Sequence, residues 1–141
     1  MISDWKWYAL GSAFFAGITA ILAKVGVEKI PSNMATLIRT FIIALFLVCL
    51  VLFRREWQNP WEMPGRSVFF LVLSALATGL SWICYYRALQ LGPASLVAPI
   101  DKLSVVVSIV LAVLFLGERL NVWQWAGSAF VTAGVLLLVY K

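Results

Sequence analysis

The 141-residue chain is 63% hydrophobic and only 12% charged, with a formal net charge of +5. Ordinary globular proteins are roughly 45–50% apolar and about 25% charged, so a soluble fold of this size cannot hide so much apolar surface. The sequence has no histidine, which removes the commonest general base and metal ligand, and we expect neither a metal nor a cofactor. Most basic residues flank apolar runs, where they orient membrane helices, so nucleic acid is not an expected partner.

Five apolar runs follow one another along the chain, and each is long enough for an α-helix to cross a hydrocarbon core of about 30 Å. We therefore predict an all-α fold, a polytopic membrane helix bundle in one domain over residues 1–141, surrounded by membrane lipid. The predicted helices cover residues 5–23, 33–53, 66–89, 93–116 and 122–140. Both cysteines, Cys49 and Cys84, fall inside these runs and are expected to be ordinary buried thiols.

Turn-forming residues separate the predicted helices. Ser32 or Asn33 is the candidate N-cap of the second helix. Gly92 suits the end of the third helix, and Pro93 suits the first turn of the fourth. Residues 117–121 predict a tight polar turn before the last helix.

Lysine and arginine are divided almost evenly between the two sides of the predicted bundle. The side of the N-terminus holds five of them: Lys6, Arg54, Arg55, Arg66 and Arg119. The opposite side holds four: Lys24, Lys29, Arg87 and Lys141. Because cytoplasmic loops of membrane proteins carry an excess of Lys and Arg, this weak bias favours a cytoplasmic N-terminus in the cytoplasmic (inner) membrane, and it leaves dual topology open.

Three charged side chains fall within the predicted spans. The second span is free of charge only over residues 40–53 and the fourth only over 103–117, and neither stretch is long enough to cross. Unless these helices fail to cross, Arg39, Asp101 and Lys102 lie within the bilayer, where a central charge costs about 2.5–3.5 kcal/mol. Arg39 and Lys102 either snorkel to the interface or line a polar cavity, whereas the short Asp101 is expected in the interior.

The fourth predicted helix has a small and polar face. Its members recur at three- and four-residue spacing: Ala94, Ala98, Asp101, Ser104, Ser108 and Ala112. We expect this face to point away from lipid. Pro99 removes one backbone hydrogen bond beside Asp101 and predicts a helix kink there.

The third and fifth predicted helices carry further candidates. Trp82, Tyr85 and Tyr86 are expected to line a translocation path, with packing or interfacial anchoring as the alternative, above all for Tyr86. Gly79 on the same helix is a further substrate-binding candidate. On the last helix, Gly127 and Gly134 predict close helix packing, either with a second copy or within the monomer.

The sequence Tyr-Tyr-Arg-Ala-Leu-Gln-Leu-Gly-Pro-Ala-Ser over residues 85–95, continued by Ala98-Pro99-Ile100 and by Leu-Gly-Glu-Arg-Leu over 116–120, resembles the EamA domain of the drug/metabolite transporter superfamily. The similarity extends over nearly the whole chain, including Arg39 and the pair Gly127 and Gly134. It implies one five-helix half of an inverted-repeat transporter, in which two halves of opposite orientation enclose a cavity. A second copy in an antiparallel homodimer, or a related half-transporter, would complete the protein.

The resemblance and the intramembrane charges together predict a secondary transporter that moves a small polar, zwitterionic or anionic metabolite by alternating access. The substrate-binding candidates are Arg39, Gly79, Trp82, Tyr85, Asp101, Lys102 and Ser104. The alternatives are a non-transporting accessory subunit and half of a heteromeric lipid-linked flippase. An enzyme is not expected, because Asp101 has no histidine or activated nucleophile to work with.

Overall fold

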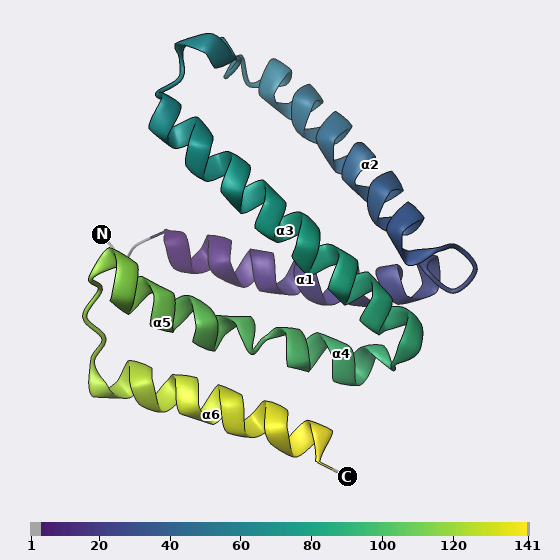
Figure 1. The fold of residues 1–141 in the computed structure, drawn as a ribbon, viewed down its shortest axis with the longest axis vertical. Helices are drawn as coiled ribbons and strands as arrows, with labels where there is room; N and C mark the ends of the chain where they lie inside the picture. The colour runs from purple at the N-terminus through teal and green to yellow at the C-terminus, as the bar shows by residue number, and fades with distance from the viewer. Residues whose placement is uncertain (1–3, 141) are drawn as a thin grey trace. The chain divides into compact units, whose positions relative to one another are not determined.

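The computed structural model describes residues 4–140, and these form helices joined by short loops (Figure 1). The helices are α1 (Trp5–Gly26), α2 (Ser32–Phe53), α3 (Gly65–Leu91), α4 (Ala94–Asp101), α5 (Ser104–Leu116) and α6 (Val122–Val139), with one turn of 3₁₀ helix, η1 (Pro60–Glu62). No strand occurs between residues 4 and 140. Five segments are long and apolar enough to cross a membrane, α4 and α5 counting together as one. The predicted all-α fold with five spans is confirmed.

The helices belong to two compact units. One comprises residues 23–91, that is, the end of α1 with α2 and α3. The other holds the chain up to Leu22 and from Gly92 onwards, with most of α1 and with α4, α5 and α6. Within the first unit α2 packs along α3, and within the second α6 packs against α4 and α5. Lys141, which the sequence assigns to the side opposite the N-terminus, lies outside the described residues.

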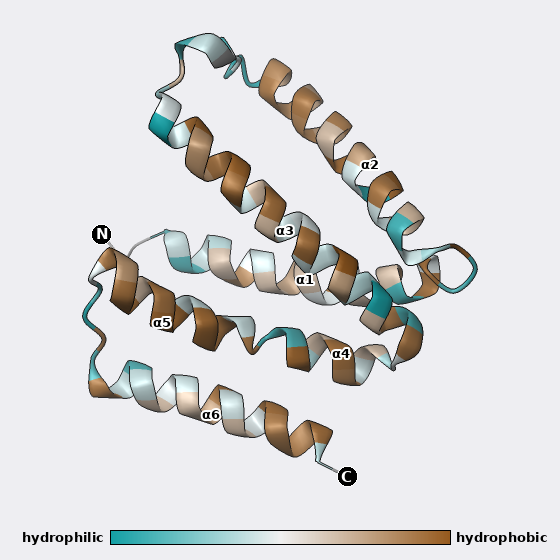
Figure 2. Ribbon diagram, in the orientation of Figure 1, coloured by the Kyte–Doolittle hydropathy of each residue, from teal (hydrophilic) through white to brown (hydrophobic). Residues whose placement is uncertain are grey.

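Hydrophobic residues, brown in Figure 2, run along much of α2, α3 and α5, and many large hydrophobic side chains of the described residues form an exposed apolar surface. The buried hydrophobic residues among those described are Ala20, Ala23, Val27, Ala35, Tyr86, Leu89 and Val135. Exposing one large apolar side chain to water costs about 1.5–3 kcal/mol, so this surface is stable only where lipid or further helices cover it. The expected burial of Cys49 and Cys84 is wrong: both are exposed, because an apolar run in a membrane helix turns side chains outwards as well as inwards.

Serine and threonine hydroxyls in the helices bond to their own backbone. Five of them donate to the carbonyl four residues earlier at 2.8–2.9 Å: Thr36, Thr40, Thr78, Ser108 and Thr132. A hydroxyl satisfied in this way needs no polar neighbour and is tolerated against lipid. The hydroxyls of α3 and α5 are therefore no sign of a wet cavity by themselves.

The predicted fourth helix over residues 93–116 is interrupted. Pro99 lies inside α4, and the interruption falls three residues later, at Lys102 and Leu103. There the amide of Lys102 donates to the Pro99 carbonyl and that of Leu103 to the Ile100 carbonyl, each at 3.0 Å. These i to i−3 bonds are those of a tighter 3₁₀ turn, which carries the chain from α4 into α5.

The helix caps differ from expectation at one position and add a motif at another. Neither Ser32 nor Asn33 is the N-cap of α2; Pro31 occupies that position, because its ring already holds φ at −55°. Asn121 caps α6 through a capping box: its side chain accepts from the Gln124 amide at 2.9 Å, and the Gln124 side chain accepts from the Asn121 amide at 2.8 Å. The spacing Asn-x-x-Gln is the sequence signal for this box.

Removing the cap side chain tests the α6 assignment. Asn121→Ala is expected to lower the free energy of unfolding by about 1 kcal/mol, because the Gln124 amide loses its acceptor. Asn33→Ala is the matched control, since the Asn33 side chain makes no cap hydrogen bond. SDS titration in detergent micelles, followed by far-ultraviolet circular dichroism, measures both. Equal losses in the two variants would contradict the assignment.

Candidate functional site

In the unit of residues 23–91, Arg39 of α2 stacks on two aromatic rings of α3. Its guanidinium carbon lies 4.3 Å from the centroid of the Trp82 ring and 5.7 Å from that of Tyr86. The two aromatic residues are four apart, so both rings lie on one face of α3. Tyr86 is only 3% exposed, and Arg39 and Trp82 are half-buried. The structure thus brings together Arg39, Trp82 and Tyr86, all three of which the sequence singles out.

This stacking explains how a membrane span accommodates an arginine. A desolvated cation–π contact contributes about 2 kcal/mol or more, which offsets much of the roughly 2.5–3.5 kcal/mol that a central charge costs. Among residues 23–91 no carboxylate forms an ion pair with Arg39. The planar Arg39 guanidinium carries five N–H donors, and pairs of them suit the two oxygens of a carboxylate.

Tyr85 and Gly79 lie on α3 beside this cluster. The Tyr85 ring meets that of Tyr86 edge-on, with 6.3 Å between centroids. Gly79 is half-exposed, and a Cβ added there would meet no atom within 4 Å. Close packing within the described chain therefore does not require glycine at position 79.

At the end of the same unit, α1 and α3 satisfy each other's unpaired carbonyls. The Lys24 Nζ of α1 donates to the carbonyl of Leu89 in the last turn of α3, at 2.6 Å. In return, the Gln90 Nε2 of α3 donates to the carbonyls of Val27, at 3.1 Å, and Ile30, at 2.8 Å, which follow α1. The last carbonyls of a helix have no partner inside it. These bonds therefore join the C-terminal ends of α1 and α3, which we call the α1–α3 junction.

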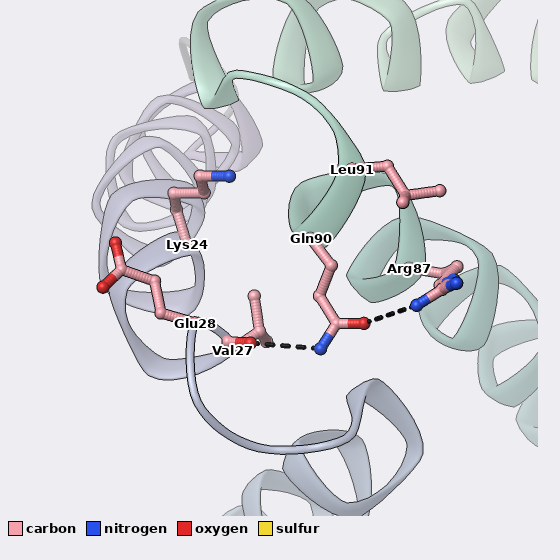
Figure 3. A pocket seen from close by; sticks show the side chains of 6 residues that line it. All are labelled: Lys24, Val27, Glu28, Arg87, Gln90 and Leu91. Carbon is pink, nitrogen blue, oxygen red and sulfur yellow. Dashed lines mark hydrogen bonds between the residues drawn. The ribbon is translucent and has the colours of Figure 1, made fainter.

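The junction borders a pocket of about 390 Å³ (Figure 3). Its lining residues are Lys24, Val27, Glu28, Arg87, Gln90 and Leu91. Arg87 donates to the Gln90 Oε1 at 3.0 Å. Lys24 and Gln90 were not among the site residues predicted from the sequence. Gln90 belongs to the family-like segment of residues 85–95, but its hydrogen-bond partners are about 60 residues away in the chain, so the segment alone does not indicate them.

In the second unit, the other charged candidates gather at the interruption between α4 and α5. Asp101 is the last residue of α4, and Ser104 is the first of α5. The Lys102 Nζ lies 3.5 Å from the Asp101 Oδ2, with the two side chains 54% and 36% exposed. Both side chains are thus partly exposed at the surface of this unit.

A groove of about 440 Å³ runs between α5 and α6 in this unit. Its small lining residues include Ser108, Ala112, Gly127 and Ser128. Adding a Cβ to Gly127 or Gly134 would bring it within 4 Å of no atom. Contacts within the described chain therefore do not account for the glycines of α6.

Residues 5–140 match the EamA-like transporter family. An uncharacterized transporter from the cobO 3' region of Sinorhizobium sp. is 54% identical, with 98% of each chain covered. The protein RarD of Salmonella typhi is 28% identical over 94% of this chain but only 45% of its own length.

The probable 4-amino-4-deoxy-L-arabinose-phosphoundecaprenol flippase subunit ArnE of Proteus mirabilis is 27% identical, covering 59% of this chain and 74% of its own. No solved structure matches significantly. The family match spans nearly all of the chain, and the five apolar helices agree with it. The chain is a multi-pass membrane protein and belongs to the EamA-like transporter family.

Proposed function

We propose that this protein is a secondary transporter for a small metabolite that carries a carboxylate, either anionic or zwitterionic. The observation that carries the proposal is the Arg39 guanidinium, held on the faces of Trp82 and Tyr86 in a membrane span without a carboxylate partner among residues 23–91. Maintaining a cation there is costly, which is why intramembrane charges generally mark substrate or ion paths. The sequence has no phosphate-binding glycine loop, so a gradient or exchange supplies the energy.

The remaining candidates complete the proposed substrate path. Trp82, Tyr85 and Gly79 share α3 with the Arg39 contact, and they provide aromatic surface and backbone space. Asp101, Lys102 and Ser104 surround the interruption of the fourth span. Discontinuous membrane helices place backbone dipoles beside substrates in many transporters. In this proposal the Asp101 and Lys102 charges contact the polar groups of a zwitterionic substrate, and the α4–α5 interruption is where the helix adjusts as access alternates.

We further propose that two copies of the chain assemble in opposite orientations in the cytoplasmic membrane. Three observations support this: five spans in one chain, a match to less than half of RarD, and the almost equal division of Lys and Arg between the two sides. Gly127 and Gly134 are open within the described chain, so α6 offers a face for close helix packing in the dimer.

Reconstitution tests the transport proposal. Purified protein in liposomes is expected to accumulate or exchange radiolabelled amino acids, dicarboxylates or other carboxylate metabolites, with saturable uptake. The amide or methyl-ester analogue of the best substrate is the chemical control, and it should neither compete nor be transported. No uptake across such a panel, with a folded dimer confirmed by size-exclusion chromatography, would overturn the proposal.

A second candidate function is a subunit of a lipid-linked sugar flippase. The observation that favours it is the similarity to the flippase subunit ArnE of Proteus mirabilis. This function predicts a fixed stoichiometry with a different membrane protein and no uptake by the purified chain alone. Affinity purification from native membranes, with mass spectrometry of the bound proteins, distinguishes it from self-assembly.

A further inference from the structure

The pocket at the α1–α3 junction lies at the ends of two apolar helices, and in a membrane such ends fall near the lipid headgroups. α1 ends at Gly26 and α3 at Leu91, and both helices are long and apolar enough to span a bilayer. The pocket volume of about 390 Å³ falls within the range of small-ligand sites, which runs from about 300 to 1,000 Å³. Leu91, which is 75% exposed, provides an apolar wall beside the polar groups.

Charges of both signs line this pocket without neutralising each other. Arg87 on α3 and Glu28 just after α1 are both exposed, and neither forms an ion pair among residues 23–91. Figure 3 shows Lys24 and Glu28 on the α1 side of the hollow and Arg87 and Gln90 on the α3 side. A ligand that fits must therefore offer a negative and a positive group that are separated in space.

Gln90 fixes the positive part of this pocket in place. Both hydrogens of its amide nitrogen are donated to backbone carbonyls, of Val27 and Ile30, which leaves its oxygen to accept from Arg87. This orientation of the amide is the one that fits its neighbours, because carbonyls only accept hydrogen bonds and a guanidinium only donates them. Arg87 uses one of five N–H donors in the bond to Gln90, and the guanidinium is held at the pocket before any ligand arrives.

We propose that this pocket binds the headgroup of an aminophospholipid, with the phosphate at Arg87 and near the Lys24 ammonium, and the lipid amine at Glu28. Basic pockets between membrane helices at the interface are typical sites for lipid phosphates. The carboxylate adds selectivity, because it attracts a primary ammonium and repels a second anion. The acyl chains then lie along the apolar surface of α3, beside Leu91. This site does not depend on the proposed transport function.

Native mass spectrometry of the full-length protein tests the proposal. The delipidated protein in detergent is offered equal amounts of phosphatidylethanolamine, phosphatidylglycerol and phosphatidylcholine with the same acyl chains. We expect phosphatidylethanolamine adducts to dominate. Arg87→Gln should weaken the binding of phosphatidylethanolamine and phosphatidylglycerol alike by about five-fold, which corresponds to about 1 kcal/mol per interfacial basic residue.

A second variant tests the proposed contact between Glu28 and the lipid amine separately. Glu28→Gln should lower the ratio of phosphatidylethanolamine to phosphatidylglycerol adducts several-fold, and this ratio does not depend on how much protein is folded. Lys29→Gln is the matched control, because Lys29 is exposed in the same loop and does not line the pocket. Soluble O-phosphoethanolamine is offered in a separate experiment, which tests whether the pocket binds a soluble phosphate ester instead of a lipid headgroup.

Two results would overturn the proposal. The first is equal occupancy by the three lipids, or an Arg87→Gln effect no larger than that of Lys29→Gln, since either removes the role of the pocket charges. The second is binding of O-phosphoethanolamine without binding of the lipid, which assigns the site to a soluble phosphate ester instead of a lipid headgroup.

Discussion

Arg39→Lys is expected to lower carboxylate uptake in proteoliposomes by about 10- to 150-fold, although the positive charge is retained. A hydrogen bond to a charged group is worth about 1.5–3 kcal/mol, and one such bond is lost when the two-pronged contact of arginine becomes the single contact of an ammonium. The contact with Trp82 weakens at the same time, because a lysine ammonium cannot stack a planar group on the ring as arginine can. Saturation kinetics of labelled substrate measure the loss.

The controls separate recognition from folding. Arg66→Lys makes the same chemical change at the first turn of α3, outside the Arg39 cluster, and should leave uptake unchanged. Trp82→Phe keeps an aromatic face under the guanidinium, whereas Trp82→Leu does not, so uptake should fall much further in the second variant. If the Arg39→Lys variant transports as well as the wild type, Arg39 does not bind both oxygens of the substrate carboxylate.

The spans were predictable from the sequence because each apolar run is long and ends at charged, proline or glycine residues. The bounds of α2 and α3 shift by at most two residues from prediction, and α1 extends three residues further, to Gly26. Helix-terminal rules explain the rest: Pro31 displaced Ser32 as the N-cap of α2, since a fixed φ suits the position without a side-chain bond. The interruption at Lys102 and Leu103 depends on local 3₁₀ bonding that the position of Pro99 alone does not define.

The candidate site was predictable only in part. The cost of an intramembrane charge singles out Arg39 from composition alone. Its stacking on Trp82 and Tyr86 depends on how α2 and α3 align, and hydropathy does not specify that register. The bonds of Lys24 and Gln90 were missed for the same reason, because each joins residues about 60 or more positions apart. Periodicity identifies a face of one helix, whereas contacts between helices require the three-dimensional arrangement.

A homodimer of opposite orientations predicts that variants forced into one orientation lose most of their transport activity when expressed alone. The wild-type chain has five basic residues on the side of the N-terminus and four on the other. Lys29→Gln combined with Gln58→Lys gives six basic residues on the side of the N-terminus and three on the other side. The second variant combines Arg54→Gln, Arg66→Gln and Asn33→Lys, and it has three basic residues on the side of the N-terminus and five on the other side. Since the Lys and Arg bias sets insertion, the two variants should insert in opposite orientations.

Expressing the two biased variants together should restore transport, because only the mixture contains both orientations. Cysteine labelling at the termini in intact and permeabilised cells verifies each orientation, and uptake is measured in the same cells. Neither substitution set includes a proposed substrate contact, so a loss in the single variants reports on assembly and not on binding. Full activity of one biased variant alone would rule out the antiparallel pair, because a population with a single orientation cannot supply the inverted half that completes the cavity.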